Sequence, residues 1–540
     1  MVSQTSRLPR ALYQAAQVRE LDRIAIQDCG IEGFALMQRA ATAAFETLQE
    51  QWPQARHLLI FTGAGNNGGD GYVIAGLARL SGLNPEIIAV GDPDRLQGDA
   101  QRARQFAEQK GVHVNPFKSS NFLDSGGYPA DHTIIVDALL GTGLDRPVSG
   151  IYAEAIDTIN ELPFPVLAVD IPSGLGADTG MVLGVAVQAS LTITFIGMKQ
   201  GLLTGDGVDV SGRLVFSNLD VPDQVYHSPR SPGPSSLRID MPQASRSLQP
   251  RQRSANKGHF GHTVVVGGDY GFGGATLMAA RAALRVGSGL VSVVTRSVNR
   301  SGLLASQPEI MMLGTEDPEQ NEGRVAGLLE RAAVIVVGPG LGQSDWSREM
   351  LRLVLRVQEL RNTPLVVDAD GLNLLAAGLT TNEFGDAEGN DGSSHSRVNL
   401  SRSNWVLTPH PGEAARLLDC ETVDVTANRF QAVRNLQRRW GGVTLLKGAG
   451  SLICATDDPH TAIQLCDEGN PGMATGGMGD ILSGLVGGLV AQGFSLADSL
   501  RIGVCLHGEA ADQAAARRGQ RGMAATDLLD QVQELVNPRR

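Results

Sequence analysis

The sequence feature that most constrains the fold is a short apolar run, rich in Val, Ile and Leu, that recurs along the chain and stops each time at a glycine, proline or polar turn. For example, Val334–Val337 ends in a Gly-Pro-Gly turn, and Pro364–Val367 ends at Asp368. Such runs are typical of strands buried in a parallel sheet, and ligands bind at the carboxyl edge of such a sheet. The pattern therefore predicts an α/β fold whose polar turns gather at a ligand-binding edge.

Composition narrows the class of protein. The chain has 540 residues, more than one ordinary hydrophobic core contains, so we expect at least two domains. A net charge of −12 argues against a nucleic-acid-binding protein. Met1–Glu20 lacks the apolar segment of a secretory signal, and no uncharged apolar run reaches the length of a membrane span. Five scattered cysteines without a C-x-x-C pair indicate reduced thiols, so we expect a cytoplasmic protein.

The most informative single stretch is Gly469–Asp480, which reads GNPGMATGGMGD and precedes the apolar run Ile481–Val486. Small residues at a helix start let backbone N–H groups converge on an anion, and the helix dipole adds to the attraction. A carboxylate at Asp480 suits the removal of a proton from a hydroxyl that attacks a phosphoryl group. The alternative is a glycine-rich turn in which Asp480 only caps the helix. The density of small residues favours the phosphate site.

A second glycine-rich turn lies near the N-terminus, where the apolar run Leu58–Phe61 is followed by TGAGNNGGDG and by the amphipathic run Tyr72–Leu80. Strand, glycine-rich turn and helix in this order form the phosphate-binding unit of dinucleotide-type folds. Asn66 and Asn67 favour a site, because amide side chains donate to phosphate or coordinate a hard cation through oxygen. The alternative is an Asn/Gly turn with left-handed residues.

Further polar residues follow predicted strands. Asp137 and Asp170 each come directly after an apolar run, and together, near a phosphate-type turn, they indicate a site rather than two helix caps. Lys199 is either a phosphate contact or a solvated lysine. His410 lies between two prolines in a rigid turn, and a substrate contact and a structural role are equally open there.

The composition also suggests how the chain is divided. Tyr226–Asn256 is rich in Ser, Pro, Arg and Gln, so we predict a linker at 226–256 between domains 1–225 and 257–540. Leu12–Leu48 has helical spacing and predicts two packing helices without chemistry of their own. The Gly-, Ser- and Asn-rich segment 382–397 predicts a surface loop.

Longer motifs carry a resemblance to a known family. The second domain contains KGHFGHTVVVGG, GPGLG, DADGLNLL, TPHPGEAARL, LLKGAG and GNPGMATGGMGD, and it resembles a ribokinase-like dehydratase of hydrated NADH and NADPH. The first contains LMQRA, GAGNNGGDGYV, DALLGTG, AVDIPSG and MKQG, and it resembles the companion epimerase. Their order resembles the bifunctional NAD(P)H-hydrate repair enzymes. The resemblance implies an N-terminal Rossmann-like three-layer domain and a C-terminal ribokinase-like α/β domain.

For the first domain, the resemblance implies an epimerase that interconverts the R and S hydrates at the nicotinamide C6 and holds a potassium ion. The implied ion ligands are Asn67, Asp137 and Ser173. The implied substrate-binding residues are Asn66, Asn67, Gly68, Gly69, Asp70, Gly141, Thr142, Gly143, Leu144, Asp145, Arg146, Pro147 and Asp170.

For the second domain, the resemblance implies a dehydratase of the S hydrate that consumes ADP or ATP with Mg2+. The implied hydrate contacts are Ala275, Gly340, His410 and Asp480. The implied nucleotide-binding residues are Lys447, Gly448, Ala449, Gly450, Ser451, Gly476, Gly477 and Gly479. Ser451 and Met478 stand where many members of the family have Thr, but the backbone amides of the phosphate loop remain.

The expected dehydratase chemistry uses Asp480, kept ionised by the helix dipole, to take the C6 hydroxyl proton during phosphoryl transfer. Asp170 is expected to assist proton movement around C6 in the epimerase. The expected partners are hydrated dinucleotides and ADP or ATP, without nucleic acid or membrane, in a homo-oligomer. Two alternatives are a small-molecule kinase that releases a stable phosphorylated product, and a non-catalytic dinucleotide-binding or scaffolding role for the first domain.

Overall fold

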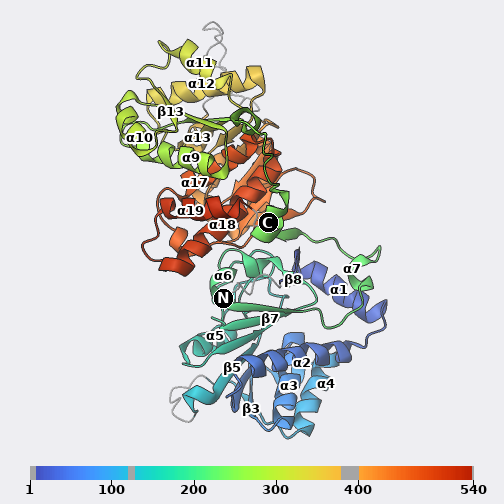
Figure 1. Ribbon diagram of the computed structural model, residues 1–540. Helices are drawn as coiled ribbons and strands as arrows, with labels where there is room; N and C mark the ends of the chain where they lie inside the picture. The colour runs from blue at the N-terminus through green and yellow to red at the C-terminus, as the bar shows by residue number, and fades with distance from the viewer. Residues whose placement is uncertain (1–7, 119–127, 379–400, 538–540) are drawn as a thin grey trace, which may run out of the picture. The chain divides into compact units, whose positions relative to one another are not determined.

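The computed structural model describes residues 8–118, 128–378 and 401–537, and the predicted loop 382–397 lies outside them. The chain divides into two compact units, 1–238 and 239–540 (Figure 1). This division falls inside the segment predicted as a linker, which nevertheless contains the short strand β10 (Ser236–Ile239) and the short helix α8 (Met241–Ala244). Among the described residues, none of the helices combines the length and apolar character needed to cross a bilayer.

The first unit is built on a seven-stranded sheet in the order β4-β3-β2-β5-β6-β7-β9, in which all neighbours are parallel. The order reverses between β2 and β5, and ligands bind at such a switch point because the loops there diverge to opposite faces of the sheet. The strands are β2 (His57–Thr62), β3 (Asn84–Ala89), β4 (Val114–Pro116), β5 (Thr133–Ala138), β6 (Val166–Val169), β7 (Leu191–Phe195) and β9 (Arg213–Ser217).

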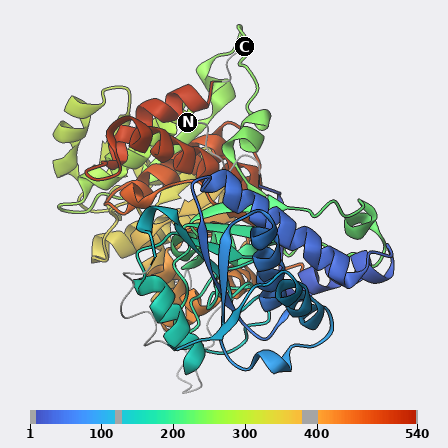
Figure 2. The same ribbon diagram turned by 90° about the horizontal axis from the view of Figure 1, so that it is seen from below.

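Helices cover both faces of this sheet. Leu58 and Ile60 of β2 pack into a core shared with the helices on one face, whereas Leu59 and Phe61 pack with α5 on the other. Figure 2 shows the teal helix α5 and the blue helices on opposite sides of the blue strands. The predicted three-layer arrangement is therefore present. The helices are α1 (Ala15–Gln27), α2 (Gly33–Gln51), α3 (Asn66–Leu80), α4 (Gly98–Gln109) and α5 (Ile151–Glu161).

Helix α3 begins earlier than the sequence pattern indicated. The prediction placed NNGGDG in a turn before a helix at Tyr72, but the helix starts at Asn66. Glycine permits this early start, because a Cβ on Gly68 would lie 2.0 Å from the carbonyl oxygen of Gly63. The first helical turn therefore lies directly against the end of β2, and it carries the polar side chains with it.

The second unit contains seven parallel strands in the order β13-β12-β11-β14-β15-β16-β17, extended by the antiparallel strands β18 and β19. Its order reverses between β11 and β14, so a second switch point lies between the loops that follow these strands. The strands are β11 (His262–Val266), β12 (Leu290–Thr295), β13 (Met311–Gly314), β14 (Val334–Val337), β15 (Leu365–Val367), β16 (Trp405–Leu407), β17 (Val443–Leu446), β18 (Ser451–Cys454) and β19 (Ile463–Cys466).

Many helices surround this sheet. One group packs together over the core that includes Val265 of β11 and Val336 of β14, and Figure 1 shows it as the stacked ribbons α9, α17, α18 and α19. These four are α9 (Gly273–Val286), α17 (Met478–Ala491), α18 (Leu496–Arg518) and α19 (Leu528–Leu535). The others include α11 (Glu322–Leu329), α12 (Asp345–Arg361), α13 (Ala369–Ala376), α14 (Pro411–Leu418) and α16 (Arg429–Trp440).

Helix α17 is the buried helix predicted after the phosphate loop, and glycines set its distance from α9. A Cβ on Gly484 would lie 2.0 Å from the carbonyl oxygen of Ala279, and one on Gly488 would lie 2.3 Å from Val286 Cγ1. The two glycines are four residues apart and so share one helix face. The backbone of α17 therefore contacts α9 directly, which fixes the position of its first turn.

We predict that Gly484→Ala lowers the free energy of unfolding of the second unit by about 1–3 kcal/mol, because the methyl group overlaps the α9 backbone. Gly327→Ala in α11 is the matched control, since a Cβ there meets no atom within 4 Å. There the better helix propensity of alanine should add about 0.5–1 kcal/mol. Urea unfolding of both variants checks this, and equal stabilities would contradict the role of Gly484.

Candidate active sites

In the first unit, three predicted ion ligands meet at the switch point between β2 and β5. Ser173 donates from its Oγ to Asp137 Oδ1 at 2.6 Å and from its backbone N–H to Asp137 Oδ2 at 2.8 Å. Asn67 donates from Nδ2 to the carbonyl of Leu140 at 3.2 Å, and Ser173 Oγ contacts the same carbonyl. The strand ends and the first turn of α3 thus bring a carboxylate, a hydroxyl and an amide together.

Two features of this cluster suit a cation. The buried Oδ1 of Asn67 has no hydrogen-bond partner among the described residues. Asp137 is completely buried, and burial raises the pKa of its carboxyl to about 6 despite the hydrogen bonds from Ser173 and Leu139. An unsatisfied amide oxygen and a buried carboxylate are both oxygen donors, which hard cations prefer.

Asp170 and Lys199 form a buried ion pair in the same unit. Asp170 follows β6 in the left-handed region, with φ of 68°, and its Oδ1 accepts from Lys199 Nζ and from the Phe195 N–H at 3.2 Å. Lys199 is 1% exposed and also donates to Thr194 Oγ1 at 3.0 Å. The interpretation of Lys199 as a solvated lysine is wrong, because the side chain is buried and paired with Asp170.

Two further carboxylates accompany this pair. Burial raises the pKa of Asp70, on the first turn of α3, and the neighbouring charges of Asp170 and Asp22 raise it further. Burial likewise raises the pKa of Asp22 to about 6, opposed by Lys199. Sequence reasoning missed Asp22, because its helix α1 shows only packing periodicity. The single ammonium group of Lys199 therefore acts on three carboxyl groups, those of Asp22, Asp70 and Asp170. This arrangement suits a proton shared among the carboxyls.

The remaining predicted epimerase residues are only partly brought together. Gly141 lies next to Asn67, since a Cβ on Gly141 would be 3.3 Å from Asn67 Cβ. Gly68 and Gly69 are buried in the first turn of α3. The loop after β5 continues outward, and four of its predicted residues are exposed, namely Gly143, Asp145, Arg146 and Pro147.

In the second unit, an ion pair lies beneath the first turn of α17. Lys447 Nζ, at the end of β17, contacts Asp368 Oδ1 at 2.7 Å at the end of β15. Ser483 of α17 donates to Asp368 Oδ2 and to the carbonyl of Gly479. Burial opposes ionisation of Asp368, but Lys447 outweighs it and holds the pKa of Asp368 below its usual range. Sequence reasoning placed Asp368 at a strand end but did not include it in the site.

Asp480, the predicted base, is the third residue of α17 and half-buried. Burial raises the pKa of its carboxyl to about 7, and the charges of Asp368 and Asp370 add to this while Lys447 opposes it. The helix dipole is expected to keep Asp480 ionised, whereas desolvation and two neighbouring carboxylates act in the opposite direction and raise its pKa. A pKa near neutrality suits a general base at physiological pH.

The glycines before Asp480 leave the backbone of the loop accessible. Gly477 adopts φ of 94°, a left-handed conformation that favours glycine. A Cβ on Gly479 would lie 3.3 Å from Lys447 Nζ, so the ammonium group is adjacent to the loop. Gly476 is exposed, with no atom near the position of a Cβ. Accessible amides beside a lysine form a suitable anion site.

The turn Lys447–Ser451, also predicted to bind nucleotide, is held from below by a buried arginine. Arg429 of α16 is 4% exposed and donates to the carbonyls of Ala449 and, at 3.2 Å, of Lys447. Gly448 and Gly450 have positive φ, so the β17–β18 connection turns tightly. Lys447 is thus the first residue of this turn, and its ammonium group lies next to the Gly476–Gly479 loop.

His410 is the N-cap residue of α14, which starts at Pro411, so it does not lie in an isolated turn. Its Nδ1 accepts from the Gly412 N–H at 3.0 Å, and its backbone N–H donates to Glu413 Oε2 at 2.8 Å. Glu413 also lies 3.8 Å from Lys447 Nζ. Burial lowers the pKa of His410, and the charge of Lys447 lowers it further. The imidazole thus caps the helix through Nδ1, and its Nε2 lies 3.4 Å from Glu413 Oε1.

The predicted hydrate contacts Ala275 and Gly340 meet at the second switch point. Gly340 has φ of 57°, and a Cβ there would lie 3.0 Å from Ala275 Cβ. The Gly342 N–H donates to Asp370 Oδ2 at 3.0 Å, which links this loop to the carboxylates beside Asp480. The structure thus connects the predicted hydrate residues to the base through Asp370, another residue that sequence reasoning missed.

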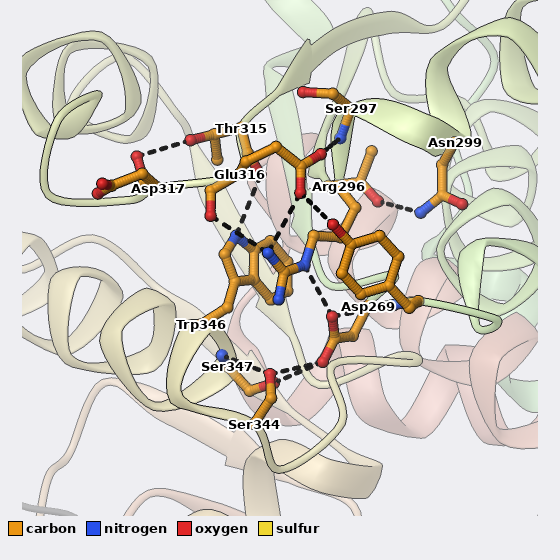
Figure 3. Close-up of polar contacts among 12 residues, drawn as sticks. Asp269, Arg296, Ser297, Asn299, Thr315, Glu316, Asp317, Ser344, Trp346 and Ser347 are labelled. Atoms are coloured by element: carbon orange, nitrogen blue, oxygen red, sulfur yellow. Dashed lines mark hydrogen bonds and ion pairs between the residues drawn. The ribbon is translucent and has the colours of Figure 1, made fainter.

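A polar network holds these switch-point loops together (Figure 3). Asp269, after β11, accepts from Arg296 Nε at 2.8 Å and from Ser344 Oγ at 2.6 Å, and its own N–H donates to Gly340 O at 2.8 Å. Arg296 also bonds Glu316, and its guanidinium lies 4.7 Å from the Trp346 ring centroid. Burial would raise the pKa of Asp269, but hydrogen bonds from Ser344 and Arg296 lower it.

The fold and these groups define a class of protein: a two-unit α/β protein in which polar and charged residues gather at the switch point of each sheet. A family described as NAD(P)H-hydrate dehydratase matches residues 263–534, and one described as YjeF-related protein N-terminus matches 33–201.

The full-length relatives agree. The chain is 42% identical to the bifunctional NAD(P)H-hydrate repair enzyme Nnr of Coxiella burnetii, covering 98% of this chain and 99% of that one. It is 41% identical to Nnr of Escherichia coli, covering 98% and 95%. The chain therefore belongs to the family of bifunctional NAD(P)H-hydrate repair enzymes. The predicted function is confirmed: it combines NAD(P)H-hydrate epimerisation with ADP- or ATP-dependent dehydration, and neither alternative holds.

Among solved structures, a ribokinase-like superfamily protein from Enterococcus faecalis is 25% identical, with a TM-score of 0.47, over 55% of this chain and 94% of that one. The ADP/ATP-dependent NAD(P)H-hydrate dehydratase from Bacillus subtilis, co-crystallised with ATP/Mg2+, is 22% identical, with a TM-score of 0.45, over 55% and 95%.

We predict that Arg296→Lys lowers the stability of the second unit by about 1–3 kcal/mol, because lysine cannot bond Asp269 and Glu316 together while stacking on the Trp346 ring. Arg361→Lys is the matched control, since Arg361 forms only an exposed pair with Glu330 and should change stability by less than about 1 kcal/mol. Denaturant unfolding measures both, and an Arg296→Lys effect as small as the control would contradict the network's role.

Proposed function

We propose that the dehydratase uses Asp480 as general base in a phosphoryl transfer from ADP or ATP to the C6 hydroxyl of the S hydrate. The observation that carries this is the position of Asp480 on the first turn of α17, beside the Gly476–Gly479 loop and the Lys447–Asp368 pair. The amides of the loop and Lys447 bind the terminal phosphates, and Lys447–Ser451 binds the rest of the nucleotide. Ala275, Gly340 and His410 contact the hydrate.

The reaction then proceeds in three steps. Asp480 takes the hydroxyl proton while the C6 oxygen bonds to the terminal phosphorus and the bond to the nucleotide's leaving oxygen breaks. The lone pair of the ring nitrogen expels the phosphate from C6 and leaves an iminium group. Loss of a proton from the adjacent C5 restores the double bond and the reduced dinucleotide. The phosphate group is therefore consumed to turn a poor leaving group into a good one.

The carboxylates around Asp480 also fit a magnesium ion. Asp368 and Asp370 lie close enough to raise the pKa of Asp480, so excess negative charge is concentrated there. Carboxylate oxygens and phosphates are the ligands that Mg2+ prefers, and the ion would supply electrostatic stabilisation of the transferring group. Asp370 would hold it together with the phosphates of the nucleotide, because Asp368 is already paired with Lys447 and Asp480 is needed as the base.

In the epimerase, we propose that Asp170, assisted by Lys199, moves the proton that allows C6 to change configuration. The carboxyls of Asp22 and Asp70 offer further positions for this proton. The residues fit a potassium ion, which Asn67 Oδ1, Asp137 and Ser173 would hold, and whose positive charge would offset the buried carboxylate. The proposed substrate loop is completed by Asn66 to Asp70 and Gly141 to Pro147.

We also propose that the domains span 1–225 and 257–540 with a linker at 226–256, that the protein is cytoplasmic, and that it forms a homo-oligomer.

For the dehydratase, we predict that Asp480→Asn retains ADP and ATP binding but loses about 10²- to 10⁴-fold in kcat, because the general base is removed while the amide loop is kept. The base acts when deprotonated, so wild-type kcat/KM should fall as pH drops below about 7, the raised pKa of Asp480. Asp457→Asn, at an exposed carboxylate, is the control. Recovery of near-ultraviolet absorbance measures turnover, and a normal rate in Asp480→Asn would refute the assignment.

For the epimerase, Asp170→Asn alone would leave Lys199 buried without a counter-charge, which destabilises proteins by about 3–5 kcal/mol. The double variant Asp170→Asn/Lys199→Met removes both charges, and it should slow R–S equilibration about 100-fold or more while dehydration of purified S hydrate stays normal. Separation of the two epimers over time measures this. Wild-type equilibration in the double variant would show that the pair plays no part in proton transfer.

A further inference from the structure

Among the described residues, two thiols and a carboxylate form a cluster outside the two candidate sites. Cys466 ends β19, Cys505 lies in the middle of α18, and Glu468 follows Cys466 by two residues. One donor atom from each residue lies within 4.8 Å of the other two. Neither cysteine takes part in the chemistry described above.

Local packing explains why the three residues meet. Gly508 lies one turn beyond Cys505 on α18, and a Cβ there would lie 2.7 Å from the backbone of Glu468. The missing side chain lets the end of β19 approach the helix. Farther along the same face of α18, Asp512 accepts from the Gly469 N–H at 2.9 Å and from Asn470 Nδ2 at 2.8 Å. The segment after β19 is thus fastened along α18.

We propose that Cys466, Cys505 and Glu468 form a site for a thiophilic divalent cation of the Zn2+ type, with a fourth position left to solvent. Glu468 Oε2 lies 3.8 Å from Cys466 Sγ, close to the separation of sulfur and oxygen ligands around a tetrahedral zinc ion. The other oxygen, Oε1, accepts from the Met241 N–H at 2.7 Å. This bond orients the carboxylate with Oε2 toward the thiols, as outer hydrogen bonds do in metal sites.

The charges around the cluster support a cation, because the carboxylates of Glu509, Asp467 and Asp240 act on Glu468. Both cysteines are fully buried, with exposures of 1% and 0%, while Glu468 is half-buried. A disulfide would use only the two sulfur atoms, whereas a metal ion would also use the carboxylate oxygen that Cys466 Sγ contacts, so the three-donor geometry favours a metal.

The position suggests a structural role. The site joins β19 to α18 directly before the segment that continues through Asn470 to the proposed phosphate loop Gly476–Gly479. The cation would therefore fix the origin of that segment, beside the bonds to Asp512. The site depends on residues that the proposed catalytic steps do not use, so its test does not depend on the proposed mechanism.

The experiment uses the full-length reduced protein, with Zn2+ or Cd2+ alone as the probe. We expect wild type to retain one zinc ion per chain after gel filtration, to show a cadmium–thiolate charge-transfer band, and to unfold at a higher temperature with zinc, because a ligand that binds only the folded state stabilises it. Cys466→Ser and Cys505→Ser should lose the band and the thermal shift. Cys454→Ser, at a buried cysteine outside the cluster, should keep both.

Glu468→Gln keeps both thiols and the acceptor for the Met241 N–H, so it tests the site even if a serine variant fails to fold. It should weaken zinc binding about 10- to 100-fold. Three results would overturn the proposal: no cadmium band in folded wild type, unchanged zinc affinity in Glu468→Gln, or a band that persists in Cys505→Ser. Mass spectrometry that finds a Cys466–Cys505 disulfide in protein that binds no metal after reduction would also overturn it.

Discussion

An ion pair between a lysine and an aspartate at the end of a parallel strand lies at the centre of each site. Lys199 pairs with Asp170 in the first unit, and Lys447 pairs with Asp368 in the second. An ammonium or carboxylate removed from water is strongly destabilising unless it is paired and hydrogen-bonded. The pairing therefore fixes both groups, and the other polar groups of each site are arranged around this ion pair. Loss of one partner would disturb the fold and the chemistry together.

In the second unit the Lys447–Asp368 ion pair is connected to helix packing. Ser483 of α17 bonds Asp368, and the next residue, Gly484, lies against the α9 backbone. Two adjacent residues thus connect the ion pair to the core and hold the first turn of α17 where Asp480 and the amide loop are needed. The Asp269–Arg296 network acts in the same way on the opposite side, because it fixes Gly340 against the start of α9. In both places the fold fixes the position of the loops at the switch point through contacts with the core.

Much of this could be predicted from residue patterns. The strands that lead to Asp170 and Lys447, the glycine-rich loop before Met478 and the buried helix that carries Asp480 follow from local composition, because apolar runs and small residues have few alternatives. The failures have two causes. The start of α3 depended on a local close contact, between Gly68 and Gly63, that residue type alone does not reveal. The pKa of Asp480 depended on Asp368 and Asp370, and the burial of Lys199 depended on Asp170, and these partners are distant in sequence.

The sequence by itself determined the α/β class, the two-part organisation and the family, because these are written in strand periodicity and in motifs of several consecutive residues. Only the tertiary structure decided which charges are paired, which carboxyls have raised pKa values, and which side chains outside every motif, such as Asp22 and Cys505, join a cluster. The physical reason is that backbone preference is local, whereas desolvation and Coulomb interactions depend on what packs nearby in space.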